Sequence, residues 1–421
     1  MYLDAYLATK SQLYLDAAHD VAKYMTTDPM LSSLGGINAS EDADSQPTAI
    51  DKHKREGAFY VFTMDEFKGT LTEEEARICA KYWNVKSQGN IDSRYDAQGE
   101  LVGQNTLCVK YEIADLAKEE GVGEDELRRI LEDGRQKLLA YRDKNRPRPA
   151  LDDKIVTSWN GMAIGGLARA GAALQTPEYI TAAVNAVECI RKNMFDESTG
   201  TLRRVYREGP GETPGFADDY SFLISGLIDL YEATFNSEWL QFADTLQQTQ
   251  IKQFWDEEKN GFFSTPANQP DILIRSKDGM DNAEPSTNGV SANNLFRLGS
   301  LLNDDKYEKL ARKTIAAFEV EIGQHPGLFS GMMSSVVASK LGMKGLMVVG
   351  DGEAAEASLK KFNENITPNY TILRIGGGAN SEWLRSRNEL LTNLGGSRQM
   401  LQLCEGGVCK LLDVKDVEKL F

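Results

Sequence analysis

A dense group of acidic side chains follows a pair of glycines near the start of the sequence. In the stretch GGINASEDADSQ, Glu41, Asp42 and Asp44 lie within four consecutive positions. Like charges this close repel one another, so the cluster needs a reason: a metal ion, a sugar, a helix end to cap, or simple exposure to water. The sequence alone leaves these four explanations open at this point.

Three later stretches, LDDKIVTSWNG, FADDYS and RSKDGMDNAEPSTNG, combine acids with amides and aromatic rings at the expected starts of helices. Asp and Asn side chains exchange hydrogen bonds with hydroxyl groups, and Trp and Tyr rings pack on the apolar face of a sugar. We therefore expect a sugar-binding funnel with a polar mouth. Its expected binding residues are Asp42, Asp153, Lys154, Trp159, Asn160, Asp218, Tyr220, Arg275 and Asn288.

Three carboxylates are the candidates for catalysis: Asp44, Asp219 and Glu284. A pair of carboxyl groups whose pKa values differ can serve as acid and base, and in glycosidases such groups lie about 5–10 Å apart. Asp218 and Asp219 are neighbours, so their side chains diverge by roughly 100° in a helix. We expect Asp218 to cap the helix and Asp219 to point into the mouth beside Tyr220.

Helix capping explains any single one of these acidic residues better than it explains all of them together. Any one of these acids could simply cap a helix, because Asp, Ser and Asn are preferred there. No metal site is predicted, since a DxDxDG loop is missing and His19, His53 and His325 stand in unrelated contexts. No cofactor is predicted either: GDGEAAEASLKKF lacks the GxGxxG and GKS/T patterns, and no GxSxG occurs.

The elements that would position these residues repeat along the chain. The segments GGINAS, TGTLRRV, NGFFSTP and PGLFSGM each follow two helical stretches, and the last three of their glycines are 61 and 66 residues apart. Two helices and a turn fit such a spacing. Paired helices with a Gly-centred return predict an (α/α)6-type toroid, and an open helical solenoid remains the alternative.

The first helix of each pair differs in composition from the second. Residues 157–171, 219–231 and 287–299 are rich in Gly, Ala and Ser, whereas the second helices carry more charge. Small side chains let neighbouring helices approach closely. We therefore expect the first helices to form an inner layer and the second helices a solvated outer layer.

Two regions interrupt the repeat. Residues 57–150 include an expected strand, GAFYVFT, and a charged helix over 124–141, and we interpret them as an inserted α+β segment. After residue 343, GLMVVG and YTILRIG resemble buried strands with a helix over 353–362 between them, and QMLQLCE and VCKLLD follow. The expected domains are a mainly α toroid over 1–343, with its insertion, and a small α/β subdomain over 344–421.

The composition of the chain argues against several classes of binding partner. With 47 Lys and Arg against 63 Asp and Glu, the chain of 421 residues carries a formal charge of -16, which disfavours nucleic acid and anionic lipid. No apolar run long enough for a membrane span and no signal-peptide pattern is visible. Five cysteines without a CxxC predict free thiols and a cytoplasmic protein. Cys404 and Cys409 are expected to be incidental thiols on a strand–turn–strand, and a redox role for them is a further hypothesis.

Five long stretches resemble the thioredoxin-domain-containing, spermatogenesis-associated protein 20 family. They are GGINASEDADS, KREGAFYVFT, LDDKIVTSWNGMAIGGLARAG, FADDYSFLISGLIDLYEATF and GMDNAEPSTNGVSANNLFRLGSLL. The resemblance implies a six-hairpin, glycosidase-like toroid, similar to N-acylglucosamine 2-epimerases, behind a thioredoxin-like domain. It implies a fold more directly than a reaction.

The sequence also departs from that family. It lacks the thioredoxin-like domain and a Pro-His-Phe-Glu-Lys-Met-Leu-Tyr-Asp stretch, which implies an N-terminally truncated toroid with about nine of the twelve helices of six hairpins. No histidine occurs at the helix starts where the epimerases use them, which argues against epimerase chemistry. An incomplete ring is expected to expose an apolar edge to a protein partner or to a second copy.

The leading hypothesis is a carbohydrate-active or carbohydrate-binding toroid, isomerase-like, epimerase-like or glycoside hydrolase-like, with a small sugar as its ligand. The alternatives are a non-catalytic binding or scaffold protein and a redox-linked accessory protein. Whether the chain is an enzyme stays open.

Overall fold

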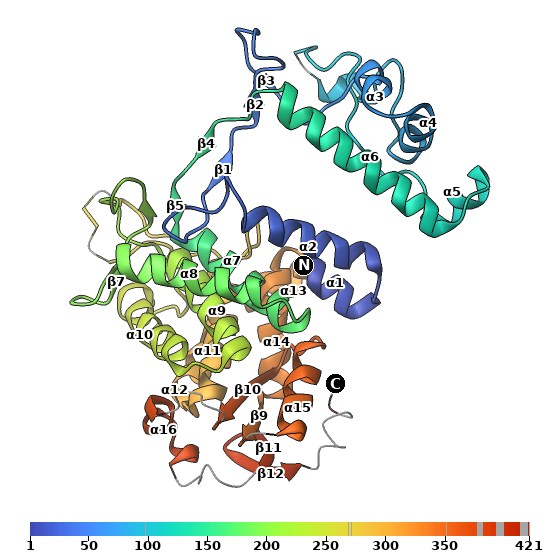
Figure 1. Ribbon diagram of the computed structural model, residues 1–421. Helices are drawn as coiled ribbons and strands as arrows, with labels where there is room; N and C mark the ends of the chain where they lie inside the picture. Colours follow the sequence, from blue (N-terminus) through green and yellow to red (C-terminus); the bar gives the residue numbers. More distant parts are fainter. Residues whose placement is uncertain are drawn as a thin grey trace. The chain divides into compact units, whose positions relative to one another are not determined.

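The computed structural model describes residues 1–96, 98–267, 269–270, 272–350, 352–376, 382–392, 400–412 and 420. The chain forms two compact units, drawn in Figure 1. One comprises Met1–Ala39 and Asp153–Phe421, and the other is Ser40–Asp152. The second unit therefore interrupts the sequence of the first.

Helical hairpins dominate the first unit (Figure 1). Helices α7, α9 and α11 pack side by side as an inner layer, and α8, α10 and α12 each pack on the inner helix that precedes them. This is an arc of an α/α toroid, as expected. The hairpins are α7 (Thr157–Ala173) with α8 (Pro177–Asn193), α9 (Ala217–Thr234) with α10 (Ser237–Phe254), and α11 (Thr287–Leu302) with α12 (Asp305–Ala316).

Glycine allows the inner helices to approach one another closely. A Cβ atom at Gly161 of α7 would lie 2.5 Å from the backbone N of Leu223 in α9. A Cβ atom at Gly226 of α9 would collide with the carbonyl oxygen of Gly161. The prediction that small residues bring the first helices of each pair together is confirmed.

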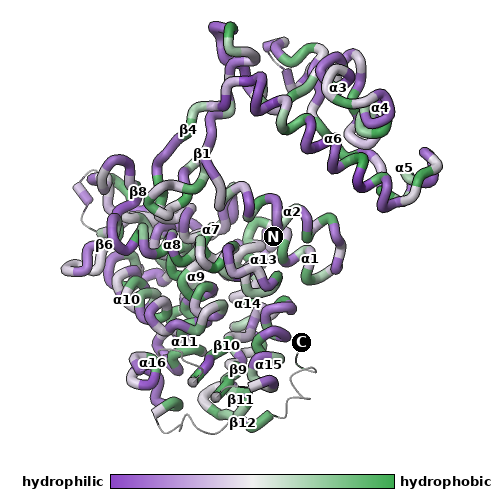
Figure 2. Tube along the Cα trace, in the orientation of Figure 1, coloured by the Kyte–Doolittle hydropathy of each residue, from purple (hydrophilic) through white to green (hydrophobic). Residues whose placement is uncertain are grey.

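Burial follows the same plan. Figure 2 shows apolar residues, in green, along α9 and in the strands of the C-terminal sheet, whereas α6 (Glu124–Asn145) is largely hydrophilic. Leu223, Leu227, Leu295 and Leu298 are fully buried in the principal core. Helix α1 (Tyr2–Thr9) adds a small cluster, since its Leu3 and Leu7 pack on Ala170 of α7, and α2 (Gln12–Met25) pairs with α1.

The fourth expected return is different. Residues PGLFSGM form a 3-10 helix, η2 (Pro326–Met332), rather than an extended segment, because Pro326 is favourable at the first position of a helix. Before it, α12 ends at Ala316 and a separate helix α13 (Glu319–Gln324) follows. Helix α14 (Met333–Leu341) then completes the helical part.

A four-stranded sheet in the order β10-β9-β11-β12 follows the helices. Strands β9 and β10 are parallel and joined through α15, while β11 and β12 form an antiparallel hairpin. The expected strands and helix are thus confirmed. Their bounds are β9 (Lys344–Val349), α15 (Glu353–Asn363), β10 (Tyr370–Ile375), α16 (Glu382–Arg387), η3 (Glu389–Leu391), β11 (Met400–Glu405) and β12 (Val408–Leu412).

Cysteine pairing corrects one expectation. Cys404 and Cys409 face each other across the β11–β12 hairpin and form a disulfide, so the prediction of free thiols is wrong for this pair. The antiparallel register places the two residues directly opposite one another, which the spacing of five residues did not reveal. Cys79, Cys108 and Cys189 are free thiols.

The unit Ser40–Asp152 has a core of its own, including Phe67, Ile78 and Leu127. The expected charged helix is confirmed, but the expected strand in GAFYVFT is wrong: that segment is a turn. The Arg146 guanidinium donates to the carbonyls of Ala58, Phe59 and Val61, and no strand partner takes them. The elements are β1 (Ser40–Glu41), β2 (Asp44–Ser45), β3 (Arg55–Glu56), α3 (Met64–Thr70), α4 (Glu73–Tyr82), η1 (Ser93–Tyr95), α5 (Ile113–Glu120), α6 (Glu124–Asn145) and β4 (Leu151–Asp152).

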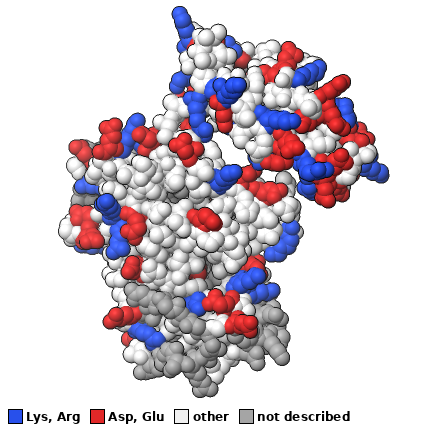
Figure 3. Space-filling view, in the orientation of Figure 1, with Lys and Arg blue, Asp and Glu red and all other residues white. Residues whose placement is uncertain are grey.

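Charge is mixed on the face drawn in Figure 3, where Lys and Arg lie among Asp and Glu over the Ser40–Asp152 unit. Within the described ranges, no helix combines the length and the apolar character needed to cross a bilayer.

Candidate functional site

The N-terminal ends of the three inner helices come together through two hydrogen bonds. The backbone N–H of Ser158 in α7 donates to Oδ1 of Asp219 in α9 (3.0 Å). The indole Nε1–H of Trp159 donates to Oε1 of Glu284, just before α11 (2.7 Å). Because α9 lies between α7 and α11, the second bond passes across the end of α9. Three predicted site residues, Trp159, Asp219 and Glu284, therefore belong to one end of the inner layer.

Trp159 is the aromatic group of this end. Its side chain is large and apolar, yet the residue is 43% exposed. The hydrogen bond to Glu284 fixes the direction of the indole. An exposed ring held in one orientation can serve as a platform for the apolar face of a ligand.

Asp219 is fully buried and performs the capping that the sequence suggested for Asp218. Its Oδ2 accepts from the backbone N–H of Phe216 (2.8 Å) and from Nη1 of Arg204 (2.8 Å). The expectation that Asp219 points into an open mouth is wrong. The helix begins at Ala217, which places Asp219 in its first turn, where a carboxylate can reach back to a free N–H group.

The groups around Asp219 act on its pKa in opposite directions. Burial, and after it the neighbouring negative charge of Asp218, raise the pKa of Asp219, which is about 7. The Arg204 guanidinium and the N–H groups of Phe216 and Ser158 act in the opposite direction. With both oxygens engaged by these donors, Asp219 is a positioning group for the helix ends.

Asp218 is the more open member of the pair. Both of its oxygens accept from Nη1 of Arg204 at 3.0 Å, and its side chain remains 22% exposed. The Arg204 guanidinium also lies over the Phe216 ring, 4.9 Å from its centroid. Arg204 was not predicted as a site residue, although the segment TLRRV before α9 contains two arginines.

Asp278 is a second residue that the prediction missed. It is exposed, and the backbone N–H of Thr287 donates to it. Desolvation and the negative charges of Asp281 and Asp218 raise the pKa of Asp278, and the Thr287 N–H opposes them. This electrostatic coupling places Asp278 near Asp218. The motif KDGMDNAE contained the signal, but it offered four acids or amides without a way to rank them.

Three predicted ligands of a sugar are instead clamps within the fold. Asn160 accepts from the backbone N–H of Ile37 (2.8 Å) and donates to its carbonyl (2.9 Å), and Asn288 does the same with Phe262 (2.7 and 2.9 Å). The Tyr220 hydroxyl accepts from the N–H of Leu202 (3.0 Å). All three side chains are buried, so each fastens a Gly-centred return to the next inner helix.

Arg275 has a structural role as well. Its guanidinium donates to the carbonyls of Thr265 and Gln253 and lies over the Phe263 ring, 4.1 Å from its centroid. Two further candidates stay nearer to solvent. Asp153 forms an ion pair with Nε of Arg207 (2.7 Å), and Lys154 is half-buried.

Asp42 and Asp44 belong to the other unit, Ser40–Asp152. The Asp42 carboxylate accepts from the backbone N–H of Asp44 (3.1 Å) and from Nζ of Lys54 (2.7 Å). The hydrogen bond from Lys54, followed by that from the Asp44 N–H, lowers the pKa of Asp42. Asp44 is exposed and lies opposite Glu56 in the antiparallel backbone pairing of β2 with β3. The acidic cluster of the opening stretch is therefore accounted for by a turn and an ion pair.

Across the residues that the structure describes, no three His, Cys, Asp or Glu side chains are arranged to hold a metal ion. The site at the ends of α7, α9 and α11 thus offers an indole, carboxylates and a guanidinium. These groups bind and orient polar ligands and can exchange protons.

The sequence of the chain is similar to those of known proteins. It is 34% identical over 401 residues to spermatogenesis-associated protein 20 of Mus musculus, covering 90% of this chain and 50% of that protein. The chain belongs to the spermatogenesis-associated protein 20 family. The family proteins of Homo sapiens and Rattus norvegicus are 33% and 32% identical, over 90% and 94% of this chain. The chain spans about half the length of the curated relatives it matches.

No family model matches the chain. Among solved structures it is similar to a family 105 glycoside hydrolase of C. acetobutylicum (13% identity, TM-score 0.35, 75% of this chain and 73% of that one). It is also similar to cellobiose 2-epimerase of Bacillus thermoamylovorans (13% identity, TM-score 0.35, 61% of this chain and 71% of that one). These similarities are too remote to give any residue a role.

Proposed function

We propose that the chain binds a carbohydrate at the N-terminal ends of α7, α9 and α11. The observation that carries the proposal is the exposed indole of Trp159, held by Glu284 across the end of α9. Sugars present apolar C–H faces and rings of hydroxyls that both donate and accept. An immobilised aromatic ring bordered by carboxylates meets both requirements.

The charged groups around the indole suit hydroxyls better than a strongly charged ligand. Arg204 is already shared between Asp218 and Asp219, so its positive charge is compensated. A phosphate group would meet the carboxylates of Asp218, Asp278 and Glu284 and be repelled. A neutral sugar can donate hydroxyl protons to the same carboxylates.

Turnover is the finer part of this proposal. Acid–base catalysis on a sugar needs one carboxyl group that holds a proton and another that does not. Asp278, with its raised pKa, suits the first role, and Asp218, ion-paired with Arg204, suits the second. Asp219 suits neither, because it is buried and occupied. The reaction would be isomerase-like, epimerase-like or glycoside hydrolase-like.

The binding proposal is tested by thermal unfolding of the chain with a panel of neutral mono- and disaccharides. A ligand that binds only the folded state raises the melting temperature. We expect the same rise for the unmodified chain and for Tyr95→Ala, which removes an exposed aromatic ring from the other unit, and a clearly smaller rise for Trp159→Ala. An undiminished shift in Trp159→Ala, or no shift with any sugar, contradicts the proposal.

A product assay with the sugar that binds then separates enzyme from scaffold. Product that disappears in Asp278→Asn supports turnover at this site. Binding without product supports the non-catalytic alternative, in which the site holds a sugar or the sugar chain of a partner.

A further inference from the structure

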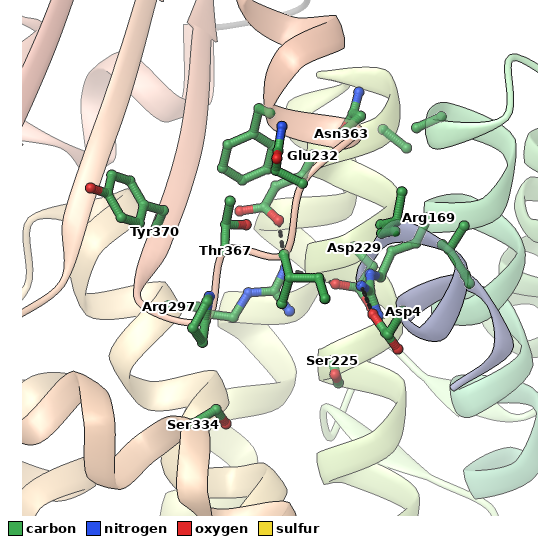
Figure 4. Close-up of a pocket in the computed structure, with 18 of the residues that line it drawn as sticks. Asp4, Arg169, Ser225, Asp229, Glu232, Arg297, Ser334, Asn363, Thr367 and Tyr370 are labelled. Atoms are coloured by element: carbon green, nitrogen blue, oxygen red, sulfur yellow. Dashed lines mark hydrogen bonds and ion pairs between the residues drawn. The ribbon is translucent and has the colours of Figure 1, made fainter. Parts of the chain in front are cut away.

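A second polar cavity lies toward the opposite ends of the same inner helices. Its volume is about 340 Å³, and Figure 4 shows its side chains converging from several elements. Helices α1, α7, α9, α11 and α14 and the segment between α15 and β10 contribute to it. Arg169 of this cavity lies ten residues beyond Trp159 in α7, which corresponds to about 15 Å along the helix. The cavity is therefore distinct from the candidate carbohydrate site.

Ion pairs within the cavity fix its charged side chains. Nη2 of Arg297 in α11 contacts Oδ1 of Asp229 (2.8 Å) and Oε2 of Glu232 (2.6 Å), both in α9. Arg169 of α7 contacts Oδ1 of Asp4 in α1 (2.5 Å). Figure 4 shows the two guanidinium groups and their carboxylates in a row across the cavity.

This row is a mosaic of both signs, which disfavours a strongly charged ligand. A phosphate or carboxylate attracted by Arg297 would meet Asp229 and Glu232 at close range, and a cation would meet Arg169 and Arg297. Both of these ion pairs are made through Nη2 of Arg297. A guanidinium carries five N–H donors, so Arg297 can also donate to an oxygen atom in the cavity.

The rest of the lining is neutral and rich in hydrogen-bonding groups. Each hydroxyl or amide can donate and accept, as can each hydroxyl of a polyol. Leu3, Leu7 and Ile366 supply apolar surface between them. The neutral polar lining residues include Ser225, Asn293, Ser334, Asn363, Asn365 and Thr367.

From this arrangement we propose that the cavity is a binding site for a small neutral polyhydroxylated molecule, such as a monosaccharide, a disaccharide or a cyclitol. Its hydroxyls would donate to Asp229 and Asp4 and accept from Arg297 and the amide groups. The volume is near the lower end of the range of about 300–1,000 Å³ that is typical of small-molecule sites, which fits a ligand of this size. The proposal stands independently of the proposed function at Trp159.

A structural explanation of the same groups must be separated from this one. Glu232 also accepts from the backbone N–H of Ile372 in β10 (3.4 Å), so the Arg297 network helps to join the helices to the sheet. Removing Arg297 would therefore change the fold and the cavity together. Filling the cavity from its neutral side chains leaves the ion pairs in place, and Ser225 and Asn293 are only half-buried.

The test is titration calorimetry of the whole chain with glucose, maltose and myo-inositol, and with glycine and sodium phosphate as charged probes. Trp159→Ala serves as the background, since it removes the indole of the candidate carbohydrate site, and we expect at least one neutral probe to bind it. Adding Ser225→Phe or Asn293→Leu to this background should weaken that binding at least tenfold. Glycine and phosphate should not bind.

Several results would overturn the proposal: no binding of any neutral probe, binding that neither filling variant weakens, or tighter binding of glycine or phosphate. Binding that is lost only in Trp159→Ala supports the other site and rejects this one. If circular dichroism shows that the filling variants do not fold, a crystal structure of the unmodified chain with the bound probe decides. A probe between Arg169 and Arg297 supports the proposal, and a probe elsewhere rejects it.

Discussion

Two adjacent carboxylates at the start of α9 illustrate how local geometry assigns roles. Asp219 is buried against two backbone N–H groups and Arg204, whereas Asp218 keeps a partly exposed side chain. One residue of difference turns a side chain by roughly 100° about the helix axis. Two adjacent aspartates can therefore differ in burial, as Asp218 and Asp219 do.

The raised pKa of Asp219 gives a prediction about pH. Its carboxyl group binds a proton more tightly in the folded than in the unfolded chain, because burial and Asp218 disfavour its charge. This contribution to stability is full below the unfolded pKa of 3.8 and is lost as the pH rises through about 7. The free energy of unfolding should thus gain a negative slope over that range, at most about 1.4 kcal/mol per pH unit from this group.

Asp218→Asn is the variant that isolates this effect. Removing the neighbouring negative charge should lower the pKa of Asp219 and make the slope between pH 4 and 7 less negative than in the unmodified chain. Urea unfolding at several pH values measures both slopes. Equal slopes would show that Asp218 has no influence on its neighbour.

The sequence indicated which helix ends carry the polar groups, but not the role of each residue there. The acids and the indole at the helix starts were visible in the sequence, and the structure gathers Trp159, Asp218 and Glu284 at one end of the inner layer. The roles of Asp218 and Asp219 were exchanged because the expected helix began at residue 219, whereas it begins at Ala217. Helix boundaries carry an uncertainty of one or two residues, and that is enough to exchange a cap and an open side chain.

At the scale of elements, the contact between α7 and α9 depends on glycine. A methyl group at Gly161 would lie 2.5 Å from backbone atoms of Leu223 and Phe222, which cannot move aside alone. We expect Gly161→Ala to lower the free energy of unfolding by about 2–4 kcal/mol through overpacking and backbone displacement.

Gly166→Ala in the same helix is the matched control. Nothing lies within 4 Å of its added Cβ, so the better helix propensity of Ala should raise stability by up to about 1 kcal/mol. Urea unfolding of both variants makes the comparison. Similar effects of the two substitutions would mean that the helices do not pack as closely as described.

The returns between hairpins depend on single amide side chains. Asn288 satisfies both the N–H and the carbonyl of Phe262, and its loss leaves two buried polar groups without partners. Asn288→Ala should cost about 2–4 kcal/mol of stability. Asn193→Ala, which removes a bond to the carbonyl of Cys189 in a half-buried position, should cost about 1 kcal/mol. Comparable losses would contradict the clamp.

Helix pairing was predictable because the Gly-centred returns recur along the chain, and the C-terminal strands were predictable because GLMVVG and YTILRIG are short apolar runs. The two errors of element type fall on short segments. GAFYVFT has the composition of a strand, but its carbonyls bond to Arg146, which lies more than eighty residues away. A contact so distant in sequence leaves no local signal.

At the scale of the whole molecule, apolar side chains remain exposed on the first hairpin. Leu13, Val21 and Tyr24 of α2 are 63%, 43% and 45% exposed. Exposed apolar groups gathered on one helix favour contact with another surface. We expect the chain to self-associate through α2, with Leu13→Lys and Tyr24→Lys together shifting it toward the monomer.

Sedimentation velocity over a range of concentrations measures this equilibrium. Val102→Lys, in the other unit and 81% exposed, serves as the control and should leave the equilibrium unchanged. A monomer at every concentration, or equal effects of the two sets of substitutions, would reject association through α2.

Carbohydrate binding at Trp159 is tested most directly by the affinity of the chain for the sugar that stabilises it most. Titration calorimetry should give the highest affinity for the unmodified chain. Trp159→Phe keeps an aromatic ring but loses the hydrogen bond to Glu284, so its affinity should be lower. Trp159→Ala should lose at least a factor of ten in affinity, equivalent to about 1.4 kcal/mol. The melting temperatures of the three unliganded proteins should be similar, because the indole is exposed. Equal affinities for the unmodified chain and Trp159→Ala would contradict the account.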